Sequence, residues 1–130
     1  MSLKDLLAEL QKEYLATFPE KTAAIERFWR ESKLEDLESE FHKIKGTGRT
    51  YGLPEVSLLG ELMEKLCQAR THENSDPLQT EALEHLKTAI PLAAAILERI
   101  RQSRAQGSGL TLEEDPDYQA LTRLLTAASK

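Results

Sequence analysis

The stretch EFHKIKGTGRTYGLPE, Glu40 to Glu55, indicates two helices joined by a tight turn. Apolar residues recur at helical spacing as far as Tyr51, Gly52 stands at a left-handed helix stop, and Pro54 suits the first turn of a new helix. So short a connection places the two helices side by side and antiparallel. The first of them carries His42 and two internal glycines, each of which costs roughly 1 kcal/mol relative to alanine.

The same signals predict helices along the rest of the chain. Leu, Ala, Glu, Lys and Gln dominate, and aromatic residues make up only 5%, so we expect an all-α protein. The pattern favours an up-and-down antiparallel four-helix bundle with an additional N-terminal helix and a C-terminal tail helix. Residues 1–106 would form the bundle, and 107–130 a flexible linker with a short helix. The expected helices are Ser2–Thr17, one from about Pro19, Leu34–Gly52, Pro54–Arg70, Asp76–Gln106 and Asp117–Ser129.

Composition excludes several classes of protein. The 130 residues suit one domain, and the formal net charge of -5 argues against binding to nucleic acid. No stretch approaches the roughly 18 apolar residues of a membrane span, and the charged N-terminus is unlike a signal peptide. The single Cys67 excludes an internal disulfide and a cysteine-based metal site, and its apolar neighbours favour a buried, inert thiol. We therefore expect a cytoplasmic protein.

His42 is expected on the exposed face of its helix. At 100° per residue, the apolar residues of that helix fall within a sector of about 100°, which faces the core. His42 points roughly 130° away from the centre of this sector. Lys45, Gly46 and Arg49 lie on the same exposed side. The apolar residues are Leu34, Leu37, Phe41, Ile44 and Tyr51.

The three glycines of the stretch have separate roles in this interpretation. Gly46 lies one turn after His42, so its missing side chain leaves the imidazole open to a large approaching body. Gly48 projects onto the core face, where a small residue permits close helix packing. Gly52 ends the helix. Only Gly46 lacks a structural benefit that offsets its cost.

An exposed imidazole beside two cations suits phosphoryl chemistry. Imidazole is largely uncharged and nucleophilic near neutral pH, and it forms covalent intermediates. Lys45 and Arg49 would stabilise the negative charge of a phosphoryl group on the ring. Which ring nitrogen reacts is left open at this point.

The segment HKIKGTGRTYGLPEVSLLGELMEKL, His42 to Leu66, resembles the signature of histidine-containing phosphotransfer (HPt) domains. A weaker resemblance in helix order extends over Leu6 to about Arg101 and leaves out the tail. The resemblance implies a phosphorelay intermediate of a two-component regulatory system. The residues that match the signature in register are His42, Ile44, Lys45, Gly46, Thr47, Gly48 and Gly52.

By this resemblance His42 accepts a phosphoryl group from a receiver-domain aspartate, usually that of a hybrid sensor kinase, and passes it to another receiver. Lys45 would orient and partly neutralise the group, while Thr47 supports the helix together with Gly48. The magnesium ion belongs to the receiver, so no cofactor is expected in this chain. A monomer suits a carrier that docks successive partners.

Two further residues are candidates for partner docking. Arg49 lies outside the family signature, and only helix geometry suggests it. Glu38 lies on the same exposed face, where the alternative is a solvated surface charge. His72 and His85 are expected to be solvated side chains with no role in metal binding.

Two alternatives stay open. The chain could be the phosphotransfer domain of a chemotaxis-type kinase, which receives phosphate from an ATP-binding domain. It has no glycine-rich nucleotide motif of its own, so it would be a carrier and not an autokinase. Lys43 follows the histidine where a dimerising sensor-kinase histidine is followed by an acidic residue. The second alternative is a helical docking module that carries no phosphate.

Overall fold

The computed structural model describes residues 2–69 and 76–128, and this part of the chain is helical with no strand. The expected all-α class is confirmed. Arg70, His72 and Ser129, which figured in the sequence predictions, lie outside the described residues. The elements are α1 (Leu3–Ala16), α2 (Phe18–Arg30), α3 (Leu34–Thr50), α4 (Pro54–Ala69), α5 (Asp76–Ala105), the 3-10 helix η2 (Leu112–Glu114) and α6 (Pro116–Ala128).

Local sequence signals account for the helix ends. Ser2 and Asp5 form a reciprocal capping box at the start of α1. Pro19 occupies the first turn of α2. Gly52 has φ +70°, the left-handed conformation that ends α3, and Pro54 opens α4 two residues later.

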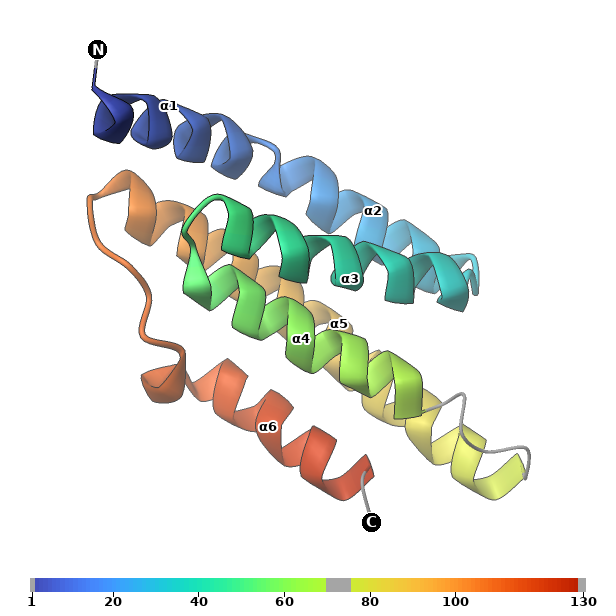
Figure 1. The fold of residues 1–130 in the computed structure, drawn as a ribbon. Helices are drawn as coiled ribbons and strands as arrows, with labels where there is room; N and C mark the ends of the chain where they lie inside the picture. Colours follow the sequence, from blue (N-terminus) through green and yellow to red (C-terminus); the bar gives the residue numbers. More distant parts are fainter. Residues whose placement is uncertain (1, 70–75, 129–130) are drawn as a thin grey trace.

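Four helices form the bundle. α2 contacts α3 and α5, and α4 contacts the same two helices, so α2 to α5 close a ring around one core (Figure 1). Each helix contributes an apolar stripe to this core, as the 3.6-residue periodicity predicts. Side chains from all four are fully buried there, among them Ile25, Phe41, Met63 and Ile96.

α1 is anchored to the bundle by its C-terminal half. Tyr14 and Leu15 are buried, and the Tyr14 ring stacks on Tyr51 with ring centroids 4.6 Å apart. Four leucines in the first eight residues of α1 remain 38 to 86% exposed. A helical stripe that the sequence alone would assign to a core is therefore left open to solvent. These leucines are Leu3, Leu6, Leu7 and Leu10.

The C-terminal segment, for which composition predicted a flexible linker and a short helix, folds back onto the bundle. α6 packs against α4 and α5, η2 packs against α6, and α6 lies alongside α4 in Figure 1. Leu112 and Leu121 are 1% and 0% exposed. Arg99 on α5 pairs with Asp115 and Asp117, and the Asp115 carboxylate also caps α6 by accepting from the amides of Asp117 and Tyr118. Apolar burial and ion pairing together hold this segment on the bundle.

Among the described residues, no helix is both long enough and apolar enough to span a membrane.

Candidate functional site

His42 projects from the exposed side of α3, as its position in the helix predicts. Its side chain is 66% exposed. One ring nitrogen is nevertheless engaged: Nδ1 lies 2.5 Å from Oε2 of Glu64 on α4. The other nitrogen, Nε2, is the one left open for chemistry.

Glu64 joins the histidine and the lysine of the predicted site. Its Oε1 accepts a hydrogen bond from Nζ of Lys45 at 2.7 Å, while Oε2 contacts His42. The Glu64 side chain is only 10% exposed. Burial acts to raise the pKa of the Glu64 carboxyl, but hydrogen bonds from Lys45 and His42 outweigh it and leave the pKa below its ordinary value. Glu64 is therefore an ionised carboxylate at neutral pH.

This carboxylate determines the protonation of the imidazole. An ionised carboxylate only accepts hydrogen bonds, so at a separation of 2.5 Å the Nδ1 atom must be the donor. In the neutral ring the proton then resides on Nδ1, and Nε2 is unprotonated with its lone pair free. A carboxylate that orients a histidine in this way also stabilises positive charge on the ring.

Small residues set the register that brings Glu64 to His42. A Cβ atom on Gly60 would lie 2.6 Å from the backbone nitrogen of Lys45, and one on Gly48 would lie 2.7 Å from that of Ser57. Ser57 Oγ also donates to the Lys45 carbonyl at 2.7 Å. Because α3 and α4 run antiparallel at this short distance, the residue one turn after Gly60 falls opposite His42. That residue is Glu64.

The three glycines of the site helix lie in three different environments. A Cβ atom on Gly46 would meet nothing within 4 Å, so the surface beside His42 is open. Gly48 is buried against α4, where any side chain would collide. Gly52 has the positive φ expected of a helix stop.

Thr47 connects the C-terminal part of α3 to α1. Its hydroxyl donates to the Lys43 carbonyl at 2.8 Å and shares a 2.6 Å hydrogen bond with the Tyr14 hydroxyl. Gln11 adds a bond of 2.6 Å from Nε2 to the Tyr51 carbonyl. α1 therefore fastens the C-terminal half of α3, which carries the open surface around Gly46.

The structure brings some of the predicted site residues together and leaves others apart. Lys45 is not an unpaired cation, because it forms an ion pair with Glu64. Arg49 is exposed on the His42 side of α3 and has no partner among the described residues. Glu38 is half-buried on the same helix.

Glu64 is the site residue that sequence reasoning missed. The sequence did contain a signal for Glu64. It is a carboxylate between Met63 and Leu66, beside the apolar stripe of α4, and it follows Gly60 by four residues, about one helical turn. Assigning it a partner required the register between α3 and α4, which no local pattern supplies.

His85 is not the solvated side chain that was expected. It is partly buried on α5, and its Nδ1 atom is buried with no hydrogen-bond partner among the described residues. The described residues contain no group of three or more His, Cys, Asp or Glu side chains that could hold a metal ion. Cys67 is fully buried, as expected from its apolar neighbours.

Comparison with known proteins identifies a family. A family model described as Hpt domain matches residues 9–106, which includes α3, α4 and the whole of the site. No curated protein and no solved structure matches the chain significantly. The matched region ends where the C-terminal segment begins.

Proposed function

Because the chain belongs to the Hpt domain family, the histidine-containing phosphotransfer modules of two-component signalling, we propose that His42 is its phosphoryl-carrying residue. Domains of this family interact with receiver domains and histidine kinases. The observation that carries the proposal is the contact of Nδ1 with Glu64 on a ring that is 66% exposed. It leaves Nε2 unprotonated and accessible to a partner.

The transfer step follows from this arrangement. The Nε2 lone pair attacks the phosphorus of a receiver's aspartyl phosphate, so the N–P bond forms as the bond from phosphorus to the aspartate oxygen breaks. The aspartate leaves as a carboxylate. The proton on Nδ1 stays in place, and the ring becomes a phosphoimidazolium paired with the Glu64 carboxylate. In the onward step the N–P bond breaks and an aspartate oxygen of a second receiver takes the group.

Lys45 has two acceptors in this scheme. In the unphosphorylated protein it is held by Glu64, 2.7 Å from Oε1. Once three phosphoryl oxygens are present on the ring, the lysine can turn toward them, since its ammonium lies at the end of a flexible chain. We propose that Lys45 orients and partly neutralises the phosphoryl group in this way.

The partners proposed are receiver domains on both sides of the transfer. The donor is the receiver of a hybrid sensor kinase, the acceptor is another receiver, and the receiver supplies the magnesium. The relay operates in the cytoplasm, with this chain as a monomeric carrier that has no ATP site of its own. Gly46 gives the receiver clearance, and Arg49 and Glu38 contact it.

A labelling experiment tests the proposal. The purified chain is mixed with a phosphorylated receiver and magnesium, and acid-labile, base-stable label is followed. His42→Gln should abolish the label, while His85→Gln, which changes a histidine on another helix, should keep it. Absence of transfer from several receivers, or label that survives in His42→Gln, refutes the proposal. Incubation with the ATP-binding domain of a chemotaxis-type kinase identifies that alternative donor.

Gly46 provides a test of docking. Gly46→Gln should slow transfer strongly while leaving the helix content unchanged, because the added side chain projects into open space beside the ring. The matched control is Gly46→Ala, whose Cβ meets no atom and which should stabilise α3 by about 0.5–1 kcal/mol. An unchanged rate in Gly46→Gln would show that no partner approaches over this surface.

A further inference from the structure

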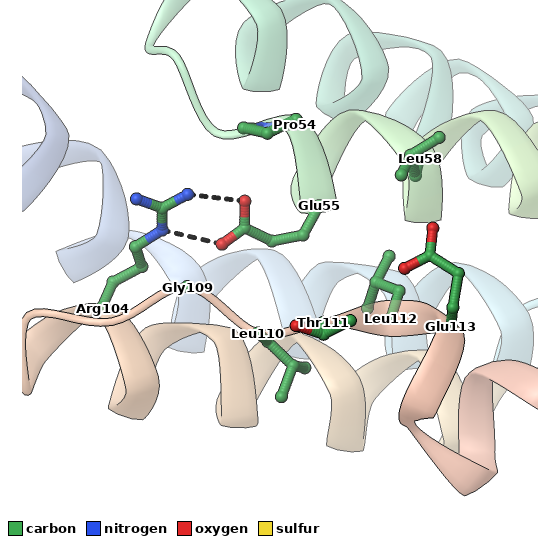
Figure 2. Close-up of a pocket in the computed structure, with 9 residues that line it drawn as sticks. All are labelled: Pro54, Glu55, Leu58, Arg104, Gly109, Leu110, Thr111, Leu112 and Glu113. Carbon is green, nitrogen blue, oxygen red and sulfur yellow. Dashed lines mark hydrogen bonds and ion pairs between the residues drawn. The ribbon is translucent and has the colours of Figure 1, made fainter.

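A pocket lies between the first turn of α4 and residues 109–113 of the C-terminal segment (Figure 2). Its volume is about 340 Å³, near the lower end of the range for ligand pockets, which suits one or two side chains of a partner. Half of its wall comes from the segment that follows residue 106, so it is absent from the part of the chain that matches the family model.

The floor of the pocket is apolar. Leu112 lies at the base and is buried, and Leu110 is half-buried beside it. Leu58 on α4 lines the open end and is 40% exposed, although a residue of this size gains free energy when it is covered. The three leucines offer a partner's aliphatic side chain a surface to pack against.

Some of the charged side chains around the pocket are already paired, and others could pair with a bound partner. Arg104 and Glu55 form a bidentate ion pair in which both nitrogen to oxygen distances are 2.7 Å, so each charge is already balanced. Figure 2 places Glu113 at the opposite end of the pocket, next to Leu58. In the part of the chain that the structure describes, neither Glu113 nor Glu114 has an ion-pair partner. The free charge at the rim is therefore negative and adjoins the exposed leucine.

The pocket faces away from the phosphotransfer site. Leu58 and Glu64 are six residues apart on α4, which separates their directions by about 120° around the helix axis. Glu64 points to α3 and His42, whereas the pocket opens on the side of α4 where the C-terminal segment packs. A partner held in the pocket would leave the ring of His42 accessible.

We propose that this pocket is a second docking site, for a partner segment that places a leucine-type side chain beside a lysine or arginine. The aliphatic side chain covers Leu58 above Leu110 and Leu112, and the cation meets Glu113. This goes beyond the phosphotransfer function, because the site would tether a basic, apolar segment while receivers exchange phosphoryl groups at His42. Opposite charge at the rim favours this partner over an acidic one.

The test uses two short peptides and the full isotopically labelled chain. Acetyl-Leu-Lys-Leu-amide and its matched control acetyl-Leu-Glu-Leu-amide are titrated while backbone amide and Leu58 methyl resonances are recorded by NMR. The lysine peptide should give saturable shifts at residues 109–113 and at Leu58 in the millimolar range, at least about fivefold tighter than the glutamate peptide. The His42 ring resonances should not move.

Two variants and a charge control complete the design. Glu113→Lys should reverse the preference between the peptides, and Leu58→Ser should abolish saturable binding of both. Glu84→Lys makes the same change of net charge at an exposed position on α5 and should behave as the unaltered chain. The proposal is overturned by non-saturable shifts, by equal affinity for the two peptides, by shifts centred on the α1 leucines, or by an unchanged preference in Glu113→Lys.

Discussion

The strongest prediction concerns Glu64, because in the proposed transfer its carboxylate leaves Nε2 of His42 as the reacting nitrogen. Glu64→Gln keeps the side-chain shape and an oxygen that can accept from Nδ1 of His42, but it removes the negative charge. Glu64→Ala removes both acceptor oxygens. The two variants therefore separate the orienting effect of the hydrogen bond from the electrostatic effect of the charge.

The magnitude follows from the contact. A hydrogen bond between charged groups contributes about 1.5–3 kcal/mol, and the ring is 66% exposed, which favours the lower end of this range. Loss of about 1.5 kcal/mol of stabilisation of the phosphoimidazolium corresponds to about a tenfold slower transfer in Glu64→Gln. Glu64→Ala should be slower still, because the ring also loses its fixed tautomer.

Rapid-quench measurement of transfer from a phosphorylated receiver gives the rates. Nitrogen NMR of the His42 ring gives the tautomer, which should shift away from protonated Nδ1 in Glu64→Ala more than in Glu64→Gln. Lys45→Ala is the control for the tautomer, since it removes the cation bound to the same carboxylate but leaves the contact with His42. Its transfer rate should also fall, because Lys45 is itself proposed to neutralise the phosphoryl group. Wild-type rate and wild-type tautomer in Glu64→Ala would refute the assignment of Nε2 and the role of Glu64.

Three other predictions concern packing, backbone strain and pH. Gly60→Ala should destabilise the fold by about 1–3 kcal/mol and slow transfer, because its Cβ would lie 2.6 Å from the Lys45 backbone nitrogen. Urea unfolding measures the loss of stability, and unchanged stability would contradict the close contact between α3 and α4. Ser32→Gly should stabilise the protein by about 0.5–1 kcal/mol in thermal unfolding, since Ser32 has φ 57° at the end of α2; a loss of stability would show that the side chain contributes more than the strain costs. Burial acts to raise the pKa of the Glu55 carboxyl, but hydrogen bonding from Arg104 outweighs it and holds the pKa below 4.5. The ion pair therefore stabilises the fold above pH 4.5, and this stabilisation is lost as the pH falls through the lowered pKa. Glu55→Gln should therefore cost about 2 kcal/mol at pH 7 and progressively less in acid, and a deficit independent of pH would refute the linkage.

Most of the helical framework could be predicted because its signals are local. Ser2 with Asp5, Pro19, Gly52 and Pro54 mark helix ends through interactions that reach only a few residues along the chain. The exposure of His42 follows from helical periodicity alone in the same way. These features depend on backbone geometry that is the same in any helix.

Local patterns did not decide where the C-terminal segment lies. Its Gly, Ser and acidic residues are typical of a linker, but Asp115 is buried on Arg99 and Leu121 enters the core. In α1, by contrast, a regular leucine stripe is largely exposed. In both cases the outcome depends on which surface of the bundle is free to receive the segment, and composition does not contain that information.

The amino-acid sequence by itself determined the helices and the exposed position of His42, because each depends on contacts within one helix. Only the tertiary structure decided that Glu64 is the partner of His42 and Lys45. Glu64 lies on α4 and the other two residues lie on α3, and they meet because Gly48 and Gly60 let the two backbones approach in one register. Which nitrogen of the His42 ring is engaged by a carboxylate is therefore set by the packing of two helices and not by the signature around the histidine.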